Sequence, residues 1–110
     1  MKDRYYYMIS IDTVKREYET NNGGYWFSPD TMRFFRSRLS DHAYVNPFNG
    51  RAYFVSSEQN HGFGGDYPRL YTVRAYDFIT GNIDEAPGHT FQEYKSRSGA
   101  DKAALKAATN

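Results

Sequence analysis

The sequence contains no cysteine among its 110 residues. This absence excludes a disulfide framework, a thiolate zinc site and a cysteine nucleophile. It is also compatible with a reducing compartment, so we expect a cytoplasmic protein.

Long apolar runs and an excess of one charge are absent as well. The apolar runs extend over only a few residues, which predicts neither a membrane span nor a signal-peptide core. Fourteen basic residues stand against 13 acidic ones, for a net charge of +1. Such a balance gives no global field for nucleic acid or a membrane, so any basic site has to be a local patch.

Leucine is scarce, whereas aromatic residues make up 18% of the chain: 11 Tyr, 8 Phe and 1 Trp. Each buried ring removes roughly 150–250 Å² from water, so a few rings are enough for a small core. The remaining Tyr side chains are expected at the surface, where they favour contacts with a partner. The length predicts a single domain, 1–110, in which residues 1–11 form an extended Tyr-rich lead.

The first half of the chain predicts an extended start and two helices. Tyr5–Ile11 is β-rich, and Asp12 or Thr13 can cap a helix that ends at the Asn-Asn-Gly-Gly of residues 21–24. A second helix is expected to begin at the Ser-Pro-Asp of residues 28–30 and to reach Leu39. Its inward face would carry Met32, Phe35 and Leu39.

The second half favours antiparallel strands. Residues 43–46 and 51–57 flank an Asn-Gly turn, 69–79 is the longest strand candidate, and a return strand begins near Ile83. Residues 98–109 predict a C-terminal helix that frays, because its inward face offers only Ala104, Leu105 and Ala108. The expected fold class is α+β: a small antiparallel sheet of three to four strands with two or three helices packed on one face.

Two surfaces are candidates for binding a partner. Arg33, Arg36 and Arg38 lie on one predicted helix and suit an acidic surface or phosphates, although a solvated helix face has the same pattern. The glycine-rich loop 58–68 carries Phe63 and Tyr67, which could anchor on a partner or simply belong to a connection.

A nucleic-acid surface is the alternative. Basic and aromatic side chains interleave on the predicted strands, as they do in domains that stack single-stranded bases. Ordinary cross-strand packing with cation–π contacts would give the same pattern. The residues concerned are Arg51, Arg69, Arg74, Tyr53, Tyr71 and Tyr76.

No catalytic, cofactor or metal constellation is recognisable. The glycines of residues 61–66 match neither a dinucleotide fingerprint nor a Walker A motif. His42, His61 and His89 lack the spacing of metal ligands, and the carboxylate pairs lie in polar stretches. We therefore expect a protein without enzymatic activity, cofactor or bound metal.

Four segments together resemble a set of small proteins of unknown function from phages and other mobile elements. They are YWFSPDTMRFFRSRL at 25–39, YFVSSE at 53–58, YTVR at 71–74 and TGNI at 80–83, and the resemblance covers roughly residues 12–108. It implies a small accessory protein made inside a bacterial host during infection.

The resemblance carries no catalytic residue across, and it gives the first functional hypothesis. The chain would be a non-enzymatic binding protein that blocks or modulates a host protein or a protein–nucleic-acid complex, as an anti-CRISPR-like counter-defence inhibitor does. The second hypothesis is an accessory domain that binds nucleic acid directly through Arg and Tyr on its sheet.

Overall fold

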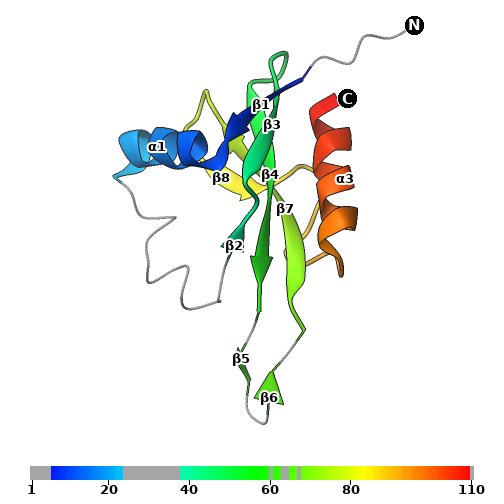
Figure 1. Ribbon diagram of the computed structural model, residues 1–110. Coiled ribbons are helices and arrows are strands. Elements are labelled where there is room, and N and C mark those ends of the chain that lie inside the picture. Colours follow the sequence, from blue (N-terminus) through cyan, green and yellow to red (C-terminus); the bar gives the residue numbers. More distant parts are fainter. Residues whose placement is uncertain (1–5, 24–37, 60, 63–64, 67, 110) are drawn as a thin grey trace, which may run out of the picture.

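A six-stranded antiparallel sheet forms the centre of the computed structural model, which describes residues 6–23, 38–59, 61–62, 65–66 and 68–109 (Figure 1). The order across the sheet is β1 (Tyr7–Ser10), β3 (His42–Asn46), β4 (Arg51–Glu58), β7 (Leu70–Asp77) and β8 (Ile83–Glu85), and β2 (Arg38–Leu39) also pairs with β4. A separate two-stranded ribbon consists of β5 (His61–Gly62) and β6 (Gly65–Asp66). The described helices are α1 (Ile11–Asn22) and α3 (Arg97–Thr109).

The central strands confirm the predicted hairpins. β3 and β4 are joined through a turn in which Gly50 has a φ of 70°, a conformation that glycine adopts without steric cost. β4 and β7 pair over eight residues, from Arg51↔Asp77 to Glu58↔Leu70. The sheet has more strands than the predicted three to four. β1 and β8 lie where the sequence indicated a β-rich start and a return strand, whereas β2, only two residues long, was not expected as a strand.

Helix α1 confirms the first predicted helix. Ser10 caps it by accepting a hydrogen bond from the Thr13 backbone N–H at 3.3 Å, whereas the sequence had suggested Asp12 or Thr13 as the cap. Gly23 ends the helix in the left-handed conformation, with a φ of 79°. Val14 is buried and Tyr18 half-buried, so their shared face points to the sheet as expected.

The helices cover opposite faces of the sheet, which corrects the expectation that they share one face (Figure 1). On the α1 side the described buried apolar residues are Val14, Ala43, Val45, Ala52, Phe54, Tyr76 and Ile83. On the α3 side they are Tyr53, Val55, Val73, Ala75, Ala86, Ala100, Ala104 and Ala108. Successive residues of a strand point to opposite faces, so β4 contributes to both clusters.

Helix α3 packs along its whole length through alanine. Ala100, Ala104 and Ala108 are each 0% exposed, and Leu105, which was predicted to share this face, is only half-buried. The four-residue spacing places the three alanines in one row, and their small side chains let the helix lie close to the sheet. The described helix thus covers a full face of the core, where the sequence suggested a thin contact.

Most of the second predicted helix lies outside the described residues. Residues 24–37, including Met32 and Phe35, lie outside the described residues. Arg38 and Leu39, which were expected at the end of that helix, instead form β2, because they pair with Ser57 and Ser56 of β4. Leu39 is half-buried and packs against the α1-side cluster.

A polar network is buried in the sheet on the α1 side, beyond the apolar cluster. The Glu58 side chain is 3% exposed and accepts hydrogen bonds from Ser56 Oγ and from Thr72 Oγ1, the latter at 3.0 Å. Arg74 contacts Glu58 at 3.4 Å and the more exposed Glu85 at 2.9 Å. The carboxylate of Glu58 therefore has hydrogen-bond partners on both oxygens, as a buried charge requires.

Candidate functional site

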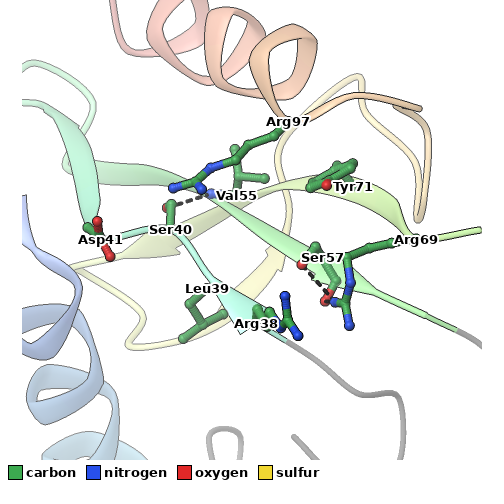
Figure 2. A pocket seen from close by; sticks show the side chains of 9 residues that line it. All are labelled: Arg38, Leu39, Ser40, Asp41, Val55, Ser57, Arg69, Tyr71 and Arg97. Atoms are coloured by element: carbon green, nitrogen blue, oxygen red, sulfur yellow. Dashed lines mark hydrogen bonds between the residues drawn. The ribbon is translucent and has the colours of Figure 1, made fainter.

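A cavity of about 220 Å³ lies on the α3 face of the sheet, at the N-terminal end of α3 (Figure 2). The link between β2 and β3 forms one wall of the cavity. β4, the start of β7 and the first residue of α3 form its other walls. The lining residues are Arg38, Leu39, Ser40, Asp41, Val55, Ser57, Arg69, Tyr71 and Arg97. We call this hollow the arginine cavity.

Strand register brings these residues together from distant parts of the chain. Arg38 pairs with Ser57 across β2 and β4, and Ser57 pairs with Tyr71 across β4 and β7. Paired residues of neighbouring strands lie on the same face, so the three form a row across the α3 face. Arg69 precedes β7, and Arg97 extends from α3 toward the β2–β3 link (Figure 2).

The three guanidinium groups are held to different degrees. Arg69 Nη1 donates to the backbone oxygen of Ser57 at 3.1 Å and to its hydroxyl at 2.9 Å. Arg38 and Arg97 are exposed, and neither forms an ion pair with any residue in the part of the chain that the structure describes. Asp41 is the single carboxylate among the described lining residues.

This arrangement concentrates positive charge in a hollow of a nearly neutral protein. The described lining residues include three arginines and one aspartate, whereas the whole chain has a net charge of only +1. Hollows lined by one sign of charge raise the local concentration of opposite charges. The guanidinium fork matches the oxygen spacing of carboxylates and phosphates, so the site is suited to bind an anionic group.

The hydroxyl groups of the cavity differ in whether they are available to a ligand. Ser40 Oγ already accepts from the Val55 N–H at 3.2 Å and donates to the His42 backbone oxygen at 3.0 Å. The hydroxyl of Tyr71 makes no hydrogen bond within the described residues. It can therefore donate to an anion in the cavity.

The cavity is lined by residues from both predicted surfaces. Arg38 came from the expected partner-binding set, whereas Arg69 and Tyr71 came from the nucleic-acid set. The other predicted partner-binding residues, Arg33, Arg36, Phe63 and Tyr67, lie outside the described residues.

The remaining residues of the nucleic-acid set do not share one surface. Arg74 and Tyr76 are buried, 8% and 0% exposed, on the α1 side of the sheet. Tyr53 is buried under α3, and Arg51 lies 3.7 Å from the Asp77 carboxylate. The pattern of alternating Arg and Tyr therefore divides between the two faces.

Sequence reasoning missed Arg97 and Ser57. One signal pointed to Arg97: it is a cation in the first turn of a helix, at the positive end of the dipole, where an acidic residue is favoured. Ser57 carried no such signal, since a serine in a strand is ordinary and only the register with Arg38 and Tyr71 makes it part of a site.

Within the described ranges, no group of three or more His, Asp or Glu side chains is placed to hold a metal ion. None of the described helices is long and apolar enough to cross a membrane.

Comparison with known proteins identifies a family without an assigned activity. Residues 10–105 match the family described as "Family of unknown function (DUF7447)". No curated protein matches the chain, and no solved structure matches it. The match extends from the cap of α1 into the last turns of α3 and includes every residue of the arginine cavity, so the chain belongs to the family of unknown function DUF7447.

Proposed function

We propose that the chain is a binding protein without enzymatic activity, and that its arginine cavity receives an acidic group of a protein partner. The observation that supports this is the convergence of Arg38, Arg69 and Arg97 from three separate parts of the chain on one hollow, in which Asp41 is the single carboxylate among the described lining residues. Arginine is enriched among the residues that dominate binding energy at protein interfaces.

The partner in this proposal is a host protein, and binding blocks or modulates it. This part rests on the resemblance to small proteins of phages and mobile elements, as does the narrower version in which the target belongs to a defence system. The site of action would be the cytoplasm of the bacterial host, which agrees with the lack of cysteine.

An acidic protein surface is favoured over nucleic acid by the division of the Arg and Tyr residues between two faces. Single-strand binding uses a continuous row of exposed aromatic rings beside a basic groove. Tyr76 is fully buried and Tyr53 is 3% exposed, so neither ring is available for a base to stack on.

The experiment compares capture of a partner by two charge-reversed variants. The site variant is Arg38→Glu/Arg97→Glu, and the matched control is Arg16→Glu/Lys102→Glu, which changes the charge equally at exposed positions of α1 and α3 outside the cavity. Immobilised protein is incubated with bacterial lysate treated with nuclease, and retained proteins are identified by mass spectrometry and quantified. Melting temperatures establish that both variants are folded.

We expect parent and control to retain the same partner in stoichiometric amount, and the site variant to lose it. Retention by the site variant at the level of the control would contradict the role of the cavity. Binding that disappears on nuclease treatment, together with a salt-dependent shift of single-stranded DNA or RNA, would favour the nucleic-acid alternative instead.

A further inference from the structure

A second cavity, of about 410 Å³, lies between α3, the start of β4 and the segment that follows β8. None of its described lining residues belongs to the arginine cavity. Its polar wall consists of Asn49, Arg51, Tyr53, His89, Tyr94 and Lys106. The volume falls in the range of about 300–1,000 Å³ that is typical of small-molecule sites, and is far larger than a bare inorganic ion needs.

The charged side chains among the described lining residues of this cavity are basic. Arg51 and Lys106 line it, and none of its described lining residues is acidic. Arg51 approaches Asp77 through Nε at 3.7 Å, which leaves the terminal nitrogens of its guanidinium group for a ligand. The Lys106 side chain makes no ion pair or hydrogen bond within the described ranges, so its ammonium group is also available.

Hydrogen bonds fix the wall of the cavity before any ligand arrives. Asn49 donates from Nδ2 to the Tyr53 hydroxyl at 3.0 Å, and its Oδ1 accepts from the Arg51 backbone N–H at 3.0 Å. Both ends of this amide are therefore occupied, and Arg51 and Tyr53 are held relative to each other. A wall ordered in this way costs little to organise on binding.

Two aromatic rings border the same cavity. The centroids of the His89 and Tyr94 rings are 5.8 Å apart, with an interplanar angle of 37°. His89 Nδ1 lies 3.2 Å from the Tyr94 hydroxyl and 3.3 Å from Glu93 Oε1, so Nε2 is the ring nitrogen left for a ligand. Flat aromatic side chains accept the face of a ring-shaped ligand.

We propose that this second cavity binds a phosphorylated small molecule that carries a flat ring, of the size and chemistry of a nucleoside monophosphate. Arg51 and Lys106 would hold the phosphate, with His89 Nε2 as a further donor, and the ring would lie against His89 and Tyr94. The proposal goes beyond the binding of a protein partner and does not depend on it.

The experiment titrates the full chain with adenosine monophosphate by isothermal calorimetry, with adenosine and inorganic phosphate as separate probes. Lys106→Ala removes the ammonium group from the cavity, while Lys102→Ala, one turn earlier on α3 and exposed, removes an equivalent charge outside it. Alanine has the highest helix propensity, so both variants keep α3. Arg51→Gln is a second variant on a different element.

We expect adenosine monophosphate to bind more tightly than either adenosine or phosphate alone. Lys106→Ala and Arg51→Gln should each weaken its binding about tenfold or more, as the loss of a charge-assisted hydrogen bond does, and Lys102→Ala should leave it unchanged. Absence of binding at millimolar nucleotide, or equal affinity in the Lys106 and Lys102 variants, would overturn the proposal.

Discussion

At the scale of single residues, the buried carboxylate of Glu58 is the group in the sheet that most needs polar partners. Ser56, Thr72 and Arg74 all contribute hydrogen bonds or ionic contacts to its carboxylate. Arg74 has a second carboxylate partner, Glu85, whose side chain is 42% exposed. The two glutamates therefore offer a matched comparison, since one arginine contacts a buried acid and a solvated one.

Glu58→Gln is expected to lower the free energy of unfolding by about 3 kcal/mol or more, because it leaves the buried Arg74 without its buried counter-charge. Glu85→Gln should cost less than about 1 kcal/mol, as is usual for an exposed ion pair. Urea denaturation of parent and both variants measures the two losses. Equal losses would show that the burial of Glu58 does not determine the energetics of this network.

At the scale of elements, Tyr44 ties α3 to β3. Its hydroxyl hydrogen-bonds to both carboxylate oxygens of Asp101, each at 2.9 Å. The pKa of Tyr44 is raised from 10.0 to about 12, with burial as the largest cause and the hydrogen bond and charge of Asp101 acting in the same direction. The folded protein thus holds this proton more tightly than the unfolded chain does.

This pKa predicts a loss of stability in alkali. The stabilisation by Tyr44 is complete below pH 10, the value for the unfolded chain, and is lost as the pH rises toward 12. The difference in unfolding free energy between parent and Tyr44→Phe should therefore shrink by about 1 to 3 kcal/mol over this interval. Chemical denaturation at a series of pH values measures it; a constant difference would contradict the link.

The elements that could be predicted from sequence are those with a local signal. The turn glycines at Gly23 and Gly50 and the alternation of Tyr53 and Phe54 identified α1 and the central hairpin. The short strand β2 has no local signal, because it forms only through its pairing with β4. The packing of α3 was underestimated, because alanine has little apolar area and becomes a core residue only when a sheet lies opposite.

The candidate site was predicted in fragments for the same reason. Arg38, Arg69 and Tyr71 were each singled out, but they were assigned to two different surfaces. They lie side by side because of the register between β2, β4 and β7. This register is non-local, so the spacing of the residues along the chain does not predict it. Arg97 enters only because α3 docks on that face of the sheet.

At the scale of the whole molecule, α3 is the cover of one entire face of the sheet. A chain that ends before Arg97 would expose Tyr53, Val55 and Val73, which are at most 4% exposed in the complete fold. We expect this truncated chain to bind a hydrophobic dye and to lose cooperative thermal unfolding, because burial of these side chains supplies much of the stabilisation of a small domain.

The matched control for this truncation ends at Ala108 and keeps all three buried alanines of α3. It should melt within a few degrees of the parent, which calorimetry and near-ultraviolet circular dichroism both report. Cooperative melting of the shorter chain at the parent temperature would show that the α1 face alone supports the fold.

The two faces of the sheet also contribute separately to the free energy of unfolding. Of the described core residues, none belongs to both apolar clusters, and the backbone of the sheet lies between them. Substitutions without shared neighbours change stability additively. A replacement at Val14 and another at Ala104 therefore act as independent increments. A protein engineer can rebuild the α3 face, with both of its cavities, while the α1 face keeps its own packing.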